Sequence, residues 1–318
     1  MFRPEAIFYV GTRKLAARCL EYLVAEVGRE RIAGVLTISH GTKGWWSFEN
    51  YPEVWEIAEQ NDLPSIKVDE LPELHYDLML SILWEKIFPQ EIISKPRFGA
   101  INLHPAPLPK YRGSLTRTYA IVNCEKSFGV SMHYMVPLVD QGDLLAVKEF
   151  PVLPDDTALS LDRRAMDYSF PLFCETWQRL CDGSAQRIPQ KNVSLHGPDA
   201  PRTYMMNSIG ELVRRPDRPL RAAEADRLRR ALHFPPKLRD LGPTQSTRFP
   251  IAERLTIKAP ESRSSGPTKN RCTFMQPWLP HARVRALSSS ARPTSCHFAE
   301  EASQRSQPSP SSATLAAG

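Results

Sequence analysis

The sequence lacks the cysteine and apolar patterns that would indicate disulfides, a metal site or a membrane span. Its six cysteines are scattered along 318 residues, with no C-x-x-C pair and no metal-like pairing with histidine. No stretch approaches the length of a membrane span, and no long apolar run follows a basic segment at the N-terminus. We therefore expect reduced thiols, no metal, no membrane partner and a cytoplasmic location.

The main part of the chain also lacks a surplus of charge. The formal net charge is +6, but residues 1–240 hold 31 basic and 31 acidic residues. Residues 241–318 hold 10 basic and 4 acidic residues, together with nine prolines and thirteen serines, and show no periodic segment. Such a composition predicts a disordered basic tail, and the neutral body argues against a large nucleic-acid-binding face.

What is present is a repeated strand–helix pattern. Residues 6–10 are an apolar run ending at Gly11, and apolar residues then recur at helical spacing up to residue 27. Further buried strands are predicted at residues 32–39 and 76–83, and another ends at residue 104. This order predicts an α/β fold with a Rossmann-like parallel sheet flanked by helices. Gly11 indicates a tight turn, because no G-x-G-x-x-G follows it.

The remaining elements are predicted from the same signals. They are a helix at 53–62, a strand at 65–68, a short helix from residue 89, a helix at 116–124, a strand at 128–136 with a hairpin partner at 143–152, a helix at about 155–183 and a helix at 221–232. Asp155 or Asp156 is the expected N-cap of the long helix. We expect a catalytic domain at 1–186, a small extension at 187–240 and the tail at 241–318.

Three polar residues follow predicted strands and form the candidate catalytic group. Asn102 and His104 end the strand in INLHP, and Asp140 lies in LVDQGDLL after the strand at 128–136. Because functional groups gather at the carboxyl ends of strands in α/β sheets, we expect the three side chains to meet. An amide can hold an oxyanion, an imidazole can move a proton, and a carboxylate can orient the imidazole. No G-x-S-x-G elbow is present, which favours transfer of a one-carbon or acyl group directly to a bound amine.

The segments INLHPAPLPKYRG, GVSMHYMVPLVDQGDLL and DTAL together resemble the folate-dependent formyltransferase family over about residues 5–185. The resemblance implies 10-formyltetrahydrofolate as the formyl donor and Asn102, His104 and Asp140 as catalytic residues. It also implies that the folate is held by two loops, one containing Trp84, Glu85, Lys86 and Ile87 and the other containing Val136, Pro137, Leu138 and Val139. Where the family usually has a Ser-Leu-Leu-Pro-like segment, this chain has Ala106-Pro107-Leu108-Pro109, and Pro107 removes one backbone donor. His133 is open to two interpretations, one facing the site and one as an ordinary strand histidine.

The acceptor is predicted to be a small amine, and an amino sugar linked to a nucleotide is the preferred candidate. Members specific for methionyl-tRNA carry a C-terminal β-barrel, for which residues 241–318 have no strand pattern, so tRNA is the weaker candidate. The segment from DAPRTYMM to RALHFPP resembles sugar N-formyltransferases, with Phe234 either stacking on a nucleotide beside His233 or anchoring the core. The alternatives are a methionyl-tRNA formyltransferase, a hydrolase that releases formate from the same donor, and a non-catalytic folate-binding relative.

Overall fold

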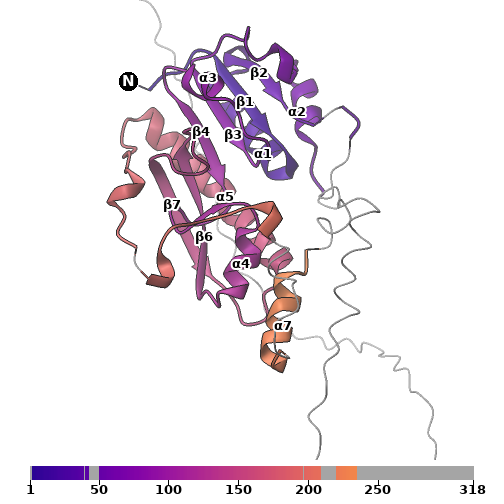
Figure 1. Cartoon of the computed structure of the whole chain (residues 1–318). Coiled ribbons are helices and arrows are strands. Elements are labelled where there is room, and N and C mark those ends of the chain that lie inside the picture. The colour runs from indigo at the N-terminus through magenta and orange to yellow at the C-terminus, as the bar shows by residue number, and fades with distance from the viewer. Residues whose placement is uncertain (1, 39, 43–49, 196, 209–219, 235–318) are drawn as a thin grey trace, which may run out of the picture. The chain divides into compact units, whose positions relative to one another are not determined.

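Six strands of the computed structural model form one mixed sheet in the order β2-β1-β3-β4-β6-β7 (Figure 1). The structure describes residues 2–38, 40–42, 50–195, 197–208 and 220–234. All of them fall within one compact unit, Met1–Pro260. The tail predicted at residues 241–318 lies outside the described residues.

The first four strands of the sheet are parallel, as the sequence predicts. They are β2 (Ile32–Leu36), β1 (Ile7–Gly11), β3 (Leu78–Ile82) and β4 (Ala100–His104). The last two strands, β6 (Ser127–Tyr134) and β7 (Leu144–Pro151), form a hairpin, and β6 pairs antiparallel with β4. The fold is therefore an α/β fold with a Rossmann-like parallel part and an antiparallel edge.

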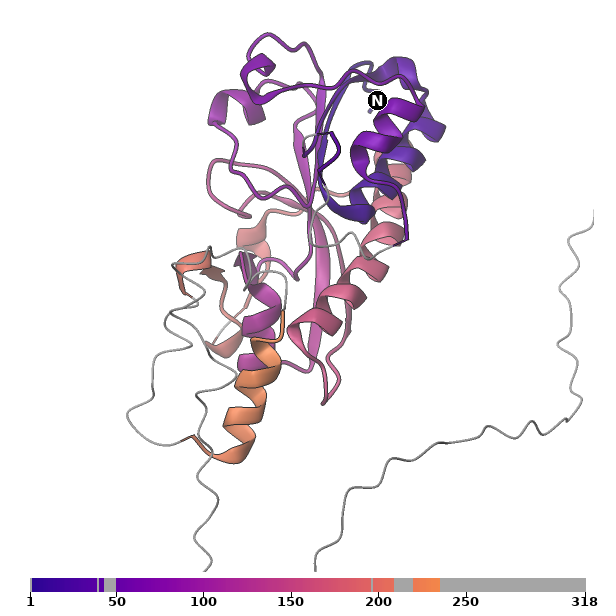
Figure 2. The ribbon, with the colours of Figure 1, turned by 90° about the vertical axis from the view of Figure 1, so that its right-hand side faces the viewer.

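Alternate side chains of the strands face two different helical layers. Ile7 and Tyr9 of β1 belong to the main core, which includes residues of α1 (Arg13–Val27), α2 (Val54–Gln60) and α5 (Ala158–Cys181). Phe8 and Val10 point to the other face and belong to a second core beneath α3 (Gln90–Ser94). Figure 2 shows α1 and α5 on one side of the sheet and α3 on the other. Because both faces of the sheet are covered, the sequences of the parallel strands are almost continuously apolar.

Two predicted details of the secondary structure are wrong. Residues 65–68 form only an isolated bridge between Val35 and Ser65, because the chain turns into the short helix Val68–Glu70. The N-cap of α5 is Thr157, whose side chain accepts from the amide of Ser160. Asp156 instead binds Arg164 and accepts from the amide of Leu153, so its carboxylate is occupied one residue before the cap.

The predicted extension contacts the rest of the unit through backbone pairing and through helix packing. Leu144 and Ile188 exchange two backbone hydrogen bonds, of 2.8 and 2.9 Å, which continue the edge of the sheet. β8 (Arg202–Tyr204) pairs with β5 (Tyr111–Gly113), and α7 (Ala222–Ala231) packs beside α4 (Thr116–Val122) (Figure 1). Phe234 is buried in the main core and His233 is exposed, so Phe234 is the core anchor of the two alternatives.

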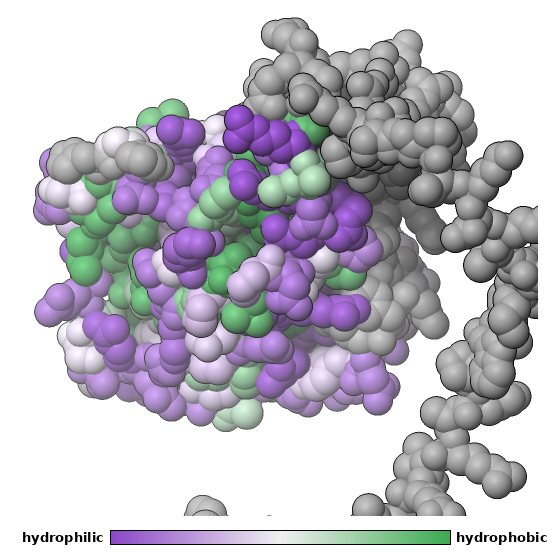
Figure 3. Space-filling model, turned by 90° about the horizontal axis from the view of Figure 1, so that it is seen from below, coloured by the Kyte–Doolittle hydropathy of each residue, from purple (hydrophilic) through white to green (hydrophobic). Residues whose placement is uncertain are grey.

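The surface seen from below is mostly hydrophilic, with hydrophobic residues gathered in small separate areas (Figure 3). The exposed large hydrophobic residues include Ile87, Leu138, Met205 and Met206, at 72%, 63%, 50% and 44% exposure. Within the part of the chain that the structure describes, no helix has both the length and the apolar character needed to cross a membrane.

Candidate active site

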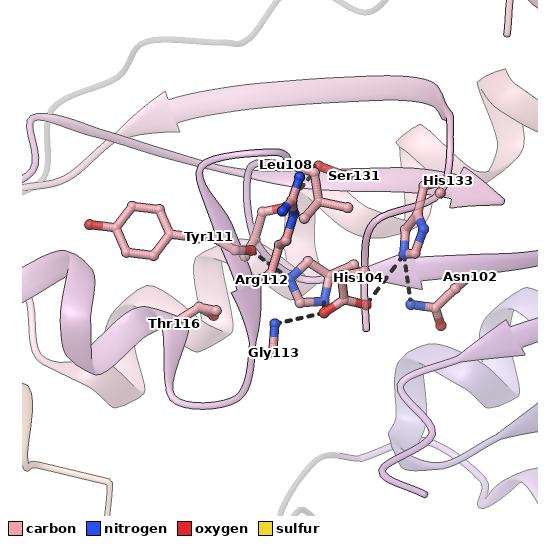
Figure 4. Close-up of polar contacts among 12 residues, drawn as sticks. Asn102, His104, Leu108, Tyr111, Arg112, Gly113, Thr116, Ser131 and His133 are labelled. Atoms are coloured by element: carbon pink, nitrogen blue, oxygen red, sulfur yellow. Dashed lines mark hydrogen bonds and ion pairs between the residues drawn. The ribbon is translucent and has the colours of Figure 1, made fainter. Parts of the chain in front are cut away.

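The proline-rich segment after β4 is held in place by one serine of the neighbouring strand. Ser131 on β6 accepts a hydrogen bond from the amide of Leu108 at 2.9 Å and donates one to the carbonyl of Ala106 at 2.8 Å. The amide of Ala106 in turn donates to the carbonyl of His104 at 2.9 Å. Ser131 thus holds the residues on both sides of Pro107, and its contact with Leu108 is shown in Figure 4.

Asp140 reaches His104 by a different route from the one predicted. Because β6 runs antiparallel to β4, its carboxyl end lies beside the start of β4, and Asn102 lies opposite His133. The loop after β6 then folds back toward the end of β4. There the Oδ2 atom of Asp140 accepts from the amide of Gly113 at 2.7 Å and lies 3.5 Å from Nδ1 of His104.

The hydrogen-bond partners determine which nitrogen of each histidine carries a proton. Nε2 of His104 lies 2.9 Å from the carbonyl of Tyr111, which can only accept, so Nε2 carries hydrogen and Nδ1 is the atom free to take up a proton. Nδ1 of His133 likewise donates to the carbonyl of Tyr134 at 2.8 Å. Its Nε2 lies 3.2 Å from Nδ2 of Asn102 and 3.5 Å from Oδ1 of Asp140, so His133 contacts both side chains (Figure 4).

Burial and neighbouring charges set the protonation states of the site. Burial lowers the pKa of His104 and outweighs the attraction of Asp140, which raises it. Burial also raises the pKa of Asp140, but His104, His133 and the Gly113 amide together hold that pKa well below its ordinary value. At neutral pH the site therefore contains a neutral imidazole facing a carboxylate, which would stabilise the imidazolium if His104 took up a proton.

A cavity of about 420 Å³ opens in front of these residues. Asn102, His104, His133 and Asp140 all line it. Seven of the eight residues assigned to the folate loops also line it: Trp84, Glu85, Lys86, Ile87, Val136, Pro137 and Val139. Leu138 is not among the lining residues. The structure thus places both loops on the wall of the cavity that contains the predicted catalytic residues.

A buried charge cluster forms a further part of the cavity wall. Asp162 on α5 is fully buried and binds Arg13 through both carboxylate oxygens, at 3.3 and 2.6 Å. Arg117 on α4 binds the same carboxylate at 2.5 Å. Burial alone raises the pKa of Asp162, but the two arginines outweigh it and lower the pKa to about 2. The cluster links α1, α4 and α5 at the cavity.

The sequence left His133 open between two interpretations, of which the structure supports the one facing the site, and it did not identify Ser131 or Gln190. Ser131 and His133 lie two apart on one strand, so the period of two could have placed them on the same face. The amide of Gly113 and the side chain of Gln190 act on Asp140 through contacts distant in sequence, for which no local signal exists. Among the described residues, no group of three or more His, Cys, Asp and Glu is placed to hold a metal ion.

Comparison with known proteins finds similarity to formyl transferases. The sequence profile of the Formyl transferase family matches residues 25–176. The chain is 33% identical over 193 residues to the methionyl-tRNA formyltransferase of Acetivibrio thermocellus, an alignment that covers 58% of this chain and 61% of that protein. It is 30% identical over 195 residues to the corresponding enzyme of Lactiplantibacillus plantarum, with the same coverage. The chain thus spans about 61% of the length of these curated relatives.

Solved structures show the same fold. A crystal structure of the N-formyltransferase from Helicobacter canadensis with folinic acid and dTDP-3-aminofucose aligns with a TM-score of 0.59 and 22% identity, over 72% of this chain and 80% of that one. WlaRD, a sugar 3N-formyl transferase crystallised with dTDP and 5-N-formyl-THF, aligns with a TM-score of 0.58 and 21% identity, over 72% of this chain and 79% of that one. At 22% and 21% sequence identity, these structural alignments support the fold of this chain.

Proposed function

We propose that the chain is a formyl transferase, which transfers a formyl group from 10-formyltetrahydrofolate to a primary amine. The observation that carries this proposal is the meeting of Asn102, His104 and Asp140 at one cavity whose wall includes the two predicted folate loops. The catalytic domain would be residues 1–186, with residues 187–240 as its extension. A cytoplasmic location stays a prediction from the sequence.

The cavity suits a flat, partly polar donor. Ile87 and Val136 supply apolar surface, at 72% and 37% exposure, on the two loops that line it. Trp84 also lines the cavity, and its indole Nε1 is buried without a hydrogen-bond partner within the described part of the chain. An acceptor atom on the bound donor would satisfy that N–H, since an unpaired buried donor is unfavourable by about 1–3 kcal/mol. Two structural neighbours were crystallised with folinic acid or 5-N-formyl-THF, which supports a formyl-folate as the donor.

The three residues then have separate roles in the transfer. As the amine attacks the formyl carbon, an N–H of the Asn102 amide donates to the developing oxyanion. Nδ1 of His104 takes the proton from the amine nitrogen and returns it to N10 of tetrahydrofolate as the carbon–nitrogen bond to the donor breaks. Asp140 stabilises the imidazolium between these two steps. Loss of one oxyanion donor typically lowers the rate about 10²- to 10³-fold.

For the acceptor, we propose the amine of a nucleotide-linked amino sugar. The sugar N-formyltransferase structures support this choice, because their similarity extends over 72% of the chain and so beyond the catalytic domain. Methionyl-tRNA is the second candidate, and it is supported by the 33% identity to a methionyl-tRNA formyltransferase. The two candidates differ in size and charge, so a direct comparison of acceptors separates them.

The test is to incubate the full chain with 10-formyltetrahydrofolate and a panel of amines, and to identify formylated products by mass spectrometry. The panel contains dTDP- and UDP-linked amino sugars, glycinamide ribonucleotide and methionyl-tRNA. We expect formylation of an amino sugar and its loss by at least about 10²-fold in Asn102→Ala and His104→Ala. Release of formate at full rate without an amine would instead identify a hydrolase, and folate binding without turnover a non-catalytic relative.

A further inference from the structure

Gln190 lies outside the matched family segment, yet its side chain contacts the loop that carries Asp140. Its Nε2 atom donates to the carbonyl of Asp140 at 2.8 Å and to the carbonyl of Gly142 at 2.7 Å. Its Oε1 atom accepts from Nε and Nη2 of Arg112, at 3.1 and 2.7 Å. The side chain is almost completely buried, with 6% exposure, and all its hydrogen-bonding positions toward protein are therefore in use.

Gln190 joins two segments, its own and β5, and each is held in place by further hydrogen bonds. On its own side, Ile188 is tied to the sheet by two backbone hydrogen bonds with Leu144. On the other side, Arg112 belongs to β5, and the next residue, Gly113, donates its amide to the Asp140 carboxylate at 2.7 Å. The amide group of Gln190 therefore spans the gap between β5 and the backbone of the Asp140 loop.

The Asp140 loop needs such support because its backbone is constrained. Asp140 has a φ of 53°, in the left-handed region that non-glycine residues seldom adopt, which is unfavourable by about 1 kcal/mol or more. Gly142 packs so closely that an added Cβ would lie 1.8 Å from the carbonyl of Tyr134. A loop in this conformation keeps its position only while surrounding contacts hold it, and Gln190 provides two of them.

We propose that Gln190 is a positioning residue, which holds the backbone of residues 140–142 so that the Asp140 carboxylate faces Nδ1 of His104. Gln190 is not among the residues that line the cavity, so it acts through Asp140 without touching the substrates. The inference rests on the proposed function and assigns to residues 187–195 a catalytic purpose, which the family segment ending at residue 176 does not include.

The test compares Gln190→Met, which keeps the length of the side chain and removes its hydrogen bonds, with Gln186→Met as the control. Gln186 is an exposed glutamine four residues earlier in the same segment. In Gln190→Met we expect kcat to fall about 10- to 100-fold, as for other displacements of about 1 Å at a reacting centre, while both KM values change less than about twofold. Gln186→Met should match the wild type. Should Gln190→Met fail to fold, Gln190→Glu replaces it, because its carboxylate still accepts from Arg112 but cannot donate to the two carbonyls.

A second readout does not depend on turnover. His104 is faced by Asp140, which raises its pKa, and by His133 and Arg117, which lower it. Displacing Asp140 should therefore move the NMR titration of the His104 imidazole to lower pH in Gln190→Met, with the signal assigned by its loss in His104→Ala. A wild-type chain without formyl transfer would contradict the proposed function, whereas an active wild type with unchanged kcat and an unchanged His104 titration in the folded Gln190 variant would overturn only this inference.

Discussion

His104 is the residue whose protonation should control the rate. Burial lowers its pKa below the usual 6.5, and Nδ1 must be unprotonated to accept the proton of the amine. The active form is therefore lost only as the pH falls through this lowered pKa. We expect the acidic limb of kcat, measured with the amine saturating, to have its midpoint below pH 6.5. A midpoint at or above pH 6.5 for the acidic limb would contradict this assignment of the base.

Asp140 should affect the same profile in a defined direction. Asp140→Asn removes the carboxylate that raises the pKa of His104 and stabilises its imidazolium. We expect a rate lower by about 10²- to 10³-fold, with the remaining activity extending to lower pH than in the wild type. The measurement is the pH dependence of kcat for both proteins. An acidic limb that moves to higher pH would show that Asp140 does not act on His104.

The residues predicted from sequence alone were those whose chemistry is visible within a few positions. Asn102 and His104 end one apolar strand, and Asp140 follows another, so the three were identified as a group. The way in which they meet was not predictable, because the antiparallel course of β6 and the return of its loop depend on contacts distant in sequence. Gln190, 50 positions from Asp140, had no local signal at all.

At the level of elements, Asp162 joins three helices through one buried carboxylate. Its folded-state pKa of about 2 lies below the ordinary value of about 3.9 for an unfolded chain, so its contribution to stability is fully present above about pH 4 and is lost as the pH falls toward 2. Asp162→Asn removes the buried negative charge that Arg13 and Arg117 share. We expect the free energy of unfolding at pH 7 to fall by about 3–5 kcal/mol in urea denaturation. Asp167→Asn, at an exposed position of the same helix, should change it by less than about 0.5 kcal/mol.

Stability should also depend on the pairing of β5 with β8. Gly113 in β5 and Gly183, which has the same φ of 79°, provide a matched comparison. An added Cβ at Gly113 would lie 2.2 Å from the carbonyl of Tyr204, whereas at Gly183 no atom lies within 4 Å. Gly183→Ala should therefore lower stability only by the local backbone strain of about 1–2 kcal/mol. Gly113→Ala should lower it further and also reduce kcat, because the Gly113 amide binds Asp140. Equal effects of the two substitutions on thermal unfolding and activity would contradict the pairing of these strands.

For the whole molecule, the extension and the tail should differ in importance. A chain truncated to residues 1–186 loses Gln190, the strand that pairs with β5, and Phe234, which is buried in the main core. Removing Phe234 alone would be expected to lower stability by about 3–5 kcal/mol, so this truncated chain should unfold at a much lower temperature and lack activity.

A chain truncated to residues 1–240 retains all of these contacts. It should keep the melting temperature and formyl transfer of the full chain, because the composition of residues 241–318 predicts no packed core. Calorimetry and turnover of the two truncated chains test this, and loss of activity in the longer one at an unchanged melting temperature would contradict the expectation that residues 241–318 are dispensable.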